Sequence, residues 1–214
     1  MRERYPNALA YLEQFRDALQ RRAAYRRYQS RAPFYSMYDV GPYTLAPVKV
    51  VWRRMDRRIN AAVVEPVADP RLGPRPVIPQ ETCVLVAADS ADEAHYLCAV
   101  LNSSLLGFLV ASHSVRGGKG FGSPGMLEFL RIRRYDVGNA IHRDLALASR
   151  EAHHIAISGG DRSEAQKRID HLTAQLWGAA GWHPTRSFSP EPTATVPSAA
   201  TVPSAAPPSP LAPG

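Results

Sequence analysis

The last residues of the chain limit how much of it can fold. Residues 184–214 contain nine prolines, and Arg186 and Glu191 are their only charged residues. The string Ala-Thr-Val-Pro-Ser-Ala also occurs twice among them. Such a composition buries too little apolar surface to offset the entropy lost on ordering. We therefore expect a folded domain over residues 1–182 and a disordered Pro/Ala-rich tail over residues 183–214.

Residues 5–29 have the spacing of one long helix. Apolar side chains recur there at intervals of three or four residues, at Leu9, Leu12, Phe15 and Leu19. The second half is strongly basic and interleaves Tyr25 and Tyr28 with five arginines, Arg21, Arg22, Arg26, Arg27 and Arg31. A cationic helix end of this kind can follow the phosphates of DNA, although a solvated arginine face has the same pattern.

The middle of the chain predicts a small β-sheet. A stretch rich in aromatic residues and proline, which excludes a regular helix, leads into the short β-branched run 48–52. Similar runs at 59–64 and 82–87 predict two more strands, and residues 129–135 alternate with the period of a half-buried strand. The connection 66–79 is interrupted by prolines. These runs predict a sheet of short strands.

Two capping patterns predict where later helices begin. Ser90 and Glu93 form a capping box, which predicts a helix over residues 91–101. The amphipathic stretch 140–157, and a second capping box that begins at Ser163, predict two closing helices. The predicted fold class is α+β, with a mixed β-sheet core, a long N-terminal helix and C-terminal helices.

The positive charge is concentrated in the first part of the chain. Residues 1–60 carry 13 Lys/Arg and 5 Asp/Glu, a net charge of +8, whereas the remainder carries 13 and 14, a net charge of −1. A basic region beside a neutral one indicates an anionic partner, and nucleic acid first. Arginine outnumbers lysine by 23 to 3, which also fits the codon bias of a GC-rich genome. The position of the charge therefore weighs more than its amount.

Composition also bears on the compartment. No run of about 18 uncharged apolar residues occurs, so we expect no membrane span and no membrane partner. The first residues lack the apolar core of a secretory signal. Cys83 and Cys98 stand in apolar surroundings and predict buried free thiols in a reducing cytosol. We expect a cytoplasmic protein.

The loop Ser114 to Gly125 has the chemistry of a site that approaches a polyanion with planar bases. Its five glycines let the backbone come close to another molecule. Arg116 and Lys119 add positive charge, and Phe121 offers a flat face for stacking. A flexible surface connection has the same composition, so both interpretations remain open.

The sequence gives little support to other chemistries. Residues 120–125 match the six-residue dinucleotide fingerprint in form, but no βαβ unit brackets them, and no Gly-Lys-Ser/Thr occurs. The spacing of His95, Cys98, His142 and the pair His153–His154 matches no zinc pattern. No serine stands in a strand–turn–helix elbow. We therefore predict no catalytic residue, no metal site and no cofactor site in this chain.

Four stretches together resemble a known family. They are residues 33–52, 77–83, 94–103 and 114–124, and residues 169–178 look like the helix that closes such proteins. In their order the chain is similar to the TaqI-type C-terminal specificity domain of adenine-specific DNA methyltransferases of restriction-modification and phage-defence systems. The resemblance covers roughly residues 5–178. It implies a target-recognition domain that grips double-stranded DNA while a separate domain binds S-adenosylmethionine and methylates a flipped adenine.

The departures from that family limit what the resemblance implies. The catalytic Asn-Pro-Pro-Tyr motif is absent, and no glycine motif for the cofactor follows an N-terminal strand. We therefore expect a standalone, partial specificity domain, with S-adenosylmethionine bound only by a separate catalytic domain or subunit. The chain begins near the start of the specificity region and leaves the family pattern after Gly178, which predicts a truncated or disrupted gene.

Charge and loop chemistry, not the resemblance, predict the DNA contacts. For groove or base contacts we predict Arg116, Lys119, Phe121 and Ser123. For phosphate contacts we predict Lys49, Arg53, Arg54, Arg26 and Arg27. Two alternatives remain open: a methyltransferase assembled in trans from this chain and a catalytic subunit, and a structural or interaction module, or gene remnant, that does not bind DNA.

Overall fold

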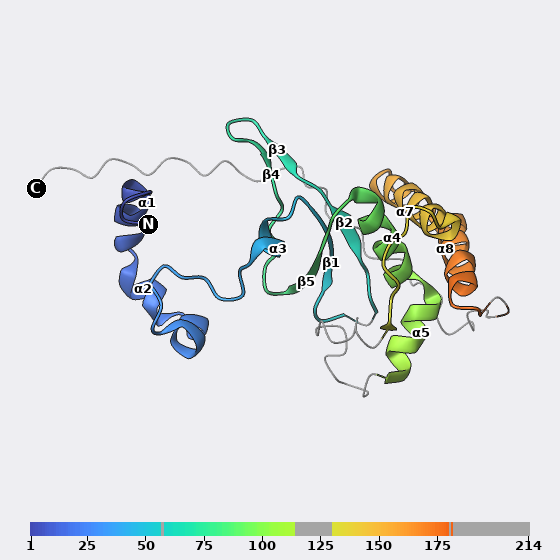
Figure 1. The fold of residues 1–214 in the computed structure, drawn as a ribbon, viewed down its shortest axis with the longest axis horizontal. Helices are drawn as coiled ribbons and strands as arrows, with labels where there is room; N and C mark the ends of the chain where they lie inside the picture. Colours follow the sequence, from blue (N-terminus) through green and yellow to red (C-terminus); the bar gives the residue numbers. More distant parts are fainter. Residues whose placement is uncertain (57, 114–129, 180, 182–214) are drawn as a thin grey trace, which may run out of the picture. The chain divides into compact units, whose positions relative to one another are not determined.

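The computed structural model describes residues 1–56, 58–113, 130–179 and 181 of the 214-residue chain. Within these residues the fold is α+β, with helices and small antiparallel sheets (Figure 1). By contacts the chain divides into a unit Met1–Trp182 and a segment His183–Gly214. The predicted disordered tail lies outside the described residues.

Strand β1, Val48–Arg53, is the centre of a three-stranded antiparallel sheet with the order β2-β1-β5. It pairs with β2, Ala62–Val64, on one side and with β5, Cys83–Ala88, on the other. Every described strand pair is antiparallel, so the prediction of a mixed sheet is wrong for this part of the chain. The predicted strands at 48–52 and 82–87 are confirmed, and the one predicted at 59–64 is shorter.

A second sheet lies inside the connection that prolines interrupt. Strands β3, Val67–Asp69, and β4, Gly73–Arg75, form a hairpin. Its turn is held by the Asp69 carboxylate, which accepts hydrogen bonds from the backbone N–H groups of Arg71 and Leu72, both at 2.8 Å. Gly73 ends the turn at φ +71°, a conformation that suits glycine.

Helix α4, Ala91–Asn102, packs against the sheet and begins where the capping pattern predicts. The Ser90 hydroxyl accepts a hydrogen bond from the Glu93 N–H at 3.1 Å. The Glu93 carboxylate accepts one from the Asp89 N–H at 2.7 Å. Helix α5, Ser104–His113, follows after a break at Ser103, whose ψ of 145° is not helical.

Two long helices complete the core. Helix α7, Ala140–Ile157, packs on α4, and helix α8, Ser163–Leu176, packs on α7, so the sheet and α4 are followed by an outer helical layer (Figure 1). Both predicted helices are confirmed. Ser163 does not cap α8, however, because it is the first helical residue and its hydroxyl donates to the Asp161 carboxylate at 2.5 Å.

The predicted long N-terminal helix is replaced by three short ones. These are α1, Pro6–Glu13; α2, Arg16–Arg21; and η1, Tyr25–Gln29, a single π-helical turn. The first break is at Phe15, with φ −110° and ψ 13°, and the second is at Arg22, with ψ 131°. The extended backbone at Arg22 accompanies three hydrogen bonds from its guanidinium to backbone carbonyls. A helical period cannot reveal such a competing set of bonds.

The described part of the predicted strand 129–135 is not a strand. Arg131 has φ +47°, which extended pairing does not permit. The Tyr96 hydroxyl donates to the Arg133 carbonyl at 3.0 Å, so this segment is held to α4 by a side chain. A short helix, α3, Pro42–Leu45, precedes β1.

Candidate nucleic-acid interface

Residues 16–38, here called the cationic segment, fold back on themselves through polar contacts. Arg22 is the main connector: its Nε donates to the Leu19 carbonyl at 2.8 Å, and its Nη2 donates to the carbonyls of Phe34, at 3.0 Å, and Ser36, at 2.8 Å. The Arg16 guanidinium lies 4.1 Å from the centre of the Phe34 ring. Arg16 and Arg22 therefore stabilise the fold of the segment.

Two further side chains close the same turn. Tyr25 is buried, and its hydroxyl donates to the Ala32 carbonyl at 2.8 Å. Gln29 donates from its amide nitrogen to the Met37 carbonyl, also at 2.8 Å. These bonds join η1 to the residues that follow it, although the turn contains little buried apolar surface.

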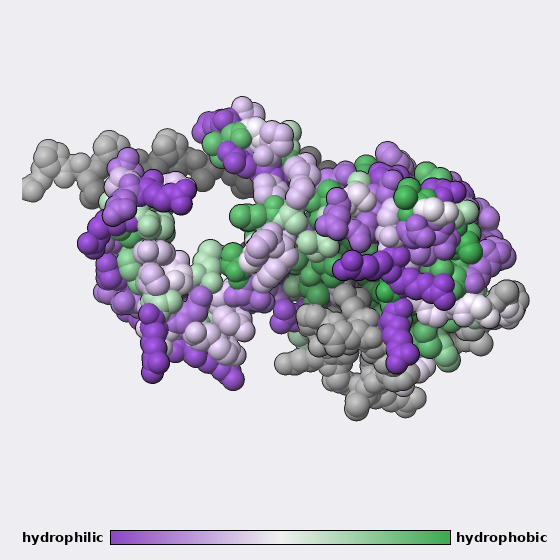
Figure 2. All heavy atoms as spheres, viewed as in Figure 1, coloured by the Kyte–Doolittle hydropathy of each residue, from purple (hydrophilic) through white to green (hydrophobic). Residues whose placement is uncertain are grey.

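The remaining arginines of the cationic segment face solvent. Within the described residues, no carboxylate pairs with this set, which consists of Arg21, Arg26, Arg27 and Arg31. The segment contains six arginines and one acid, Asp17. Over α1, α2 and η1, Figure 2 shows mostly hydrophilic residues. Unpaired guanidinium groups on a folded turn are suited to oxyanions, because each offers several donors in a planar fork.

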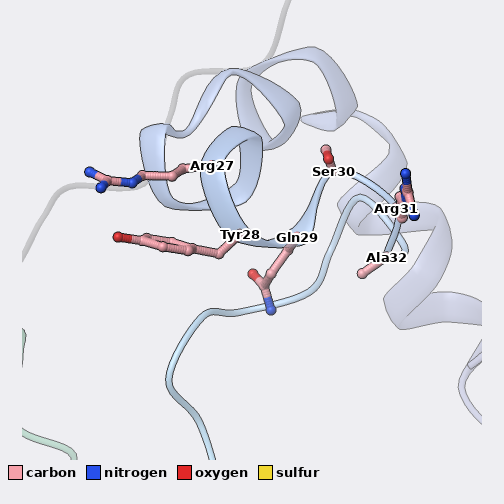
Figure 3. Close-up of a pocket in the computed structure, with 6 residues that line it drawn as sticks. All are labelled: Arg27, Tyr28, Gln29, Ser30, Arg31 and Ala32. Atoms are coloured by element: carbon pink, nitrogen blue, oxygen red, sulfur yellow. The ribbon is translucent and has the colours of Figure 1, made fainter.

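A stacked pair of tyrosines accompanies these arginines. The rings of Tyr28 and Tyr38 lie 4.4 Å apart at an interplanar angle of 19°. The Arg27 guanidinium lies 5.2 Å from the centre of the Tyr28 ring, and Figure 3 shows both side chains pointing the same way from η1. They border a shallow open hollow lined by residues 27–32. Cationic and planar groups thus meet on one surface.

The two predicted phosphate contacts at the end of β1, Arg53 and Arg54, are both exposed. Arg53 is exposed and pairs with Asp56 at 3.0 Å, which offsets part of its charge. Arg54 is exposed, and its backbone N–H donates to the Thr82 carbonyl at 2.8 Å. No described contact joins this pair to Arg26 and Arg27, which are neighbours on η1.

Lys49, a predicted phosphate contact, is buried in this structure. The exposed fraction of Lys49 is 0%. Lys49 lies in the central strand, on the face opposite Val50 and Trp52. Its ammonium donates to the carbonyl of Ala46 and, at 2.9 Å, to that of Val77. Burial lowers the pKa of Lys49. This lysine is therefore a support of the backbone, and it cannot reach a phosphate without local opening.

Four predicted contacts, Arg116, Lys119, Phe121 and Ser123, lie outside the described residues. The sequence analysis assigns no DNA contact to Tyr38. It also assigns none to three exposed arginines that follow the loop Ser114 to Gly125, which are Arg131, Arg133 and Arg134. Arg131 and Arg133 line a second shallow hollow with the end of α8. The signal for these arginines was their alternation, which was interpreted as a strand.

The core contains a cluster of polar side chains that link its helices and strands. His95 Nδ1 and Ser149 Oγ are hydrogen-bonded at 3.1 Å, and the His153 ring lies 5.0 Å from the His95 ring. The Val63 N–H donates to His153 Nε2 at 3.1 Å, which links β2 to α7. Burial, followed by electrostatic interaction with His153 and Arg150, lowers the pKa of His95 to about 4. These side chains join elements of the core, and they line neither of the two hollows at residues 27–32 and at the end of α8.

Metal-binding clusters and membrane-spanning helices are two further features that bear on the site. Among the described residues, no group of three or more His, Cys, Asp or Glu side chains could hold a metal ion. None of the described helices is by itself long and apolar enough to cross a bilayer; α4 with residues 104–112 passes that test only as a pair bent by 58°.

Comparison with known proteins adds no relative. No protein-family model matches the sequence. No curated protein matches it either. The resemblance to methyltransferase specificity domains therefore stays a prediction.

Proposed function

We propose that this chain binds double-stranded DNA through the phosphate backbone, with the cationic segment as its main contact. One observation carries the proposal: a folded turn has four exposed arginines in the eleven residues from Arg21 to Arg31, and none of them forms an ion pair among the described residues. A surface that contacts several phosphates releases condensed counterions from DNA, which is the main source of sequence-independent affinity. Arg53 and Arg54 add a second cationic position on the same chain.

The more specific role is that of a target-recognition domain of an adenine-N6 DNA methyltransferase. The order of motifs described above supports it. In this role the chain has no catalytic residue and no cofactor site of its own, and S-adenosylmethionine is bound by a separate catalytic domain or subunit. Base contacts are assigned to Arg116, Lys119, Phe121 and Ser123, and arginine is the side chain best suited to guanine.

The test is a salt series with the full chain and a random-sequence duplex. We expect affinity to fall steeply between about 50 and about 200 mM salt. A variant in which Arg21, Arg26, Arg27 and Arg31 are all replaced by Ala should lower the slope of log affinity against log salt by about 3 to 4 units. A wild-type slope near zero would reject DNA binding.

A matched control has the same loss of charge elsewhere. Replacing four other exposed arginines by Ala, at Arg71, Arg75, Arg162 and Arg168, removes the same net charge. If DNA binding depends on overall charge alone, the two variants will weaken affinity equally. If it depends on the cationic segment, the control variant will keep most of the affinity.

Docking of a protein subunit is a second candidate function of the N-terminal helices. No residue of α1 is buried within the described part of the chain, and Tyr11 and Phe15 are exposed while their rings contact each other at 5.3 Å. A catalytic subunit supplied in trans would cover such a surface. Co-purification with a methyltransferase subunit that is lost on replacing Tyr11 and Phe15 by Ser would support this candidate.

A further inference from the structure

Tyr28 and Tyr38 form an aromatic platform that the fold holds at the surface. Their exposed fractions are 53% and 50%, although their rings are stacked with centres 4.4 Å apart. The platform is fixed from below by the bond from Gln29 to the Met37 carbonyl, which ties η1 to the residue before Tyr38. Its position is therefore set by the turn and does not depend on the two rings alone.

The role of these two tyrosines differs from that of their neighbours. Tyr25 is 8% exposed and its hydroxyl is bonded to Ala32, and the Tyr43 hydroxyl is bonded to Asp39. Within the described residues, no hydrogen bond is made by the hydroxyls of Tyr28 and Tyr38. About half of each residue's surface remains exposed to water, so packing of the segment does not account for the pair.

The groups around the platform indicate its ligand. The Arg27 guanidinium lies over Tyr28, and Arg26 and Arg31 are exposed on the same short segment. Aromatic rings bordered by arginines bind single-stranded nucleic acid, because bases stack on the rings while guanidinium groups hold the phosphates. A base inside a duplex is already stacked on both faces, so only an unpaired base can use the platform.

We propose that the Tyr28–Tyr38 platform stacks an unpaired base, so that the chain binds duplex DNA with an extrahelical or single-stranded nucleotide more tightly than perfect duplex DNA. The inference rests on the proposed DNA binding and assigns to the cationic segment a preference that phosphate contacts alone do not provide. One stacked base should raise affinity about tenfold.

The test compares two duplexes that differ in one unpaired nucleotide. The bulged duplex carries 2-aminopurine at the unpaired position, because its fluorescence is quenched when it stacks on an aromatic ring. With the full chain we expect about tenfold tighter binding of the bulged duplex, with quenching on binding. Replacing Tyr28 and Tyr38 together by Leu should abolish both the preference and the quenching.

Two further variants separate stacking from folding. Replacing the same tyrosines by Phe keeps the rings, so the preference should persist. Replacing two exposed tyrosines elsewhere, Tyr5 and Tyr11, by Leu removes two rings from another place and should leave both the preference for the bulged duplex and the quenching as they are in the wild type. Circular dichroism checks that each variant is folded.

The outcomes distinguish the two proposals. If the wild-type chain binds both duplexes equally, with a steep salt dependence and no quenching, the platform is rejected while DNA binding stands. If it binds neither duplex, both proposals are rejected, and the platform becomes a candidate contact for a protein. If the Leu variant keeps the preference, the unpaired base is held by another part of the chain.

Discussion

The cationic segment and helix α4 place their aromatic residues in different surroundings. Helix α4 buries seven of its twelve residues, and its Tyr96 is 1% exposed. Helices α1 and α2, whose residues the structure describes in full, bury none. The cationic segment is held by hydrogen bonds to carbonyls and by ring contacts. Apolar burial stabilises one region, while the other keeps four of its arginines and the rings of Tyr28 and Tyr38 at the surface, at the cost of local stability.

The largest difference should appear when a leucine is shortened in α4 and in α1, the helix that precedes the cationic segment. Leu101 is 1% exposed in the core cluster, so Leu101→Ala should lower the free energy of unfolding by about 3 kcal/mol. Leu9→Ala, in α1, should lower it by less than about 1 kcal/mol, because Leu9 is only half-buried. Denaturant unfolding of the two variants measures this. Equal losses would mean that α1 contributes to the core.

Acid should destabilise the core before it affects the cationic segment. The pKa of His95 is about 4 in the fold and about 6.5 when the chain is unfolded, so between these values only the unfolded state binds the proton. The stability that His95 contributes is therefore complete above about pH 6.5 and is lost as pH falls toward 4. The loss should be about 2 to 3 kcal/mol.

The measurement is the free energy of unfolding at pH 7 and near pH 4.5 in the wild type and in His95→Asn. The variant should show a weaker dependence on pH across this interval. Arginines do not titrate there, so the salt slope of DNA binding should stay constant wherever the chain is folded. An unchanged pH dependence in the variant would assign the effect to another group.

Loss of Arg22 should open the cationic segment without unfolding the core. Arg22→Ala removes three hydrogen bonds to the carbonyls of Leu19, Phe34 and Ser36, and should destabilise the turn by about 2 kcal/mol. Amide exchange over residues 25–37 should then become faster while exchange in α4 is unchanged. Arg21→Ala, which changes the same charge, should leave exchange unaffected. Faster exchange in both regions would show that they unfold together.

The smallest effect should come from an arginine on the outside of the core. Arg150 pairs with Asp92 at 2.6 Å, joining α7 to α4, but the two side chains are 36% and 56% exposed. Solvent and salt screen such a pair, so Arg150→Ala should cost less than about 1 kcal/mol. Thermal unfolding at low and high salt measures this. A loss as large as that of Leu101→Ala would contradict the interpretation of a surface pair.

Local patterns in the sequence predicted the core well. The Ser90 hydroxyl and the apolar spacing of 140–157 act within a few residues, so the start of α4 and the extent of α7 could be inferred. The break at Arg22 could not, because the competing carbonyls belong to Phe34 and Ser36, which are 12 and 14 residues away.

The candidate site was predicted less well than the core, for the same reason. The interleaving of Tyr28 with arginines was visible, but its partner Tyr38 comes from beyond the turn. The burial of Lys49 is not predictable from the sequence, because charge alone does not say which face of a strand another segment covers. The assigned base contacts at 116–123 lie outside the described residues and stay predictions.

The buried amine of Lys49 can report how often the structure around it opens. An amine-reactive acylating reagent needs a neutral nitrogen that it can touch, and Lys49 is closed off by the backbone around Ala46 and Val77. Lys167, whose side chain is 72% exposed, reacts at all times and supplies the reference rate. The labelling rate of Lys49 divided by that of Lys167 can be measured by mass spectrometry of the labelled peptides. This ratio therefore reports how often the backbone around Ala46 and Val77 moves away and exposes Lys49.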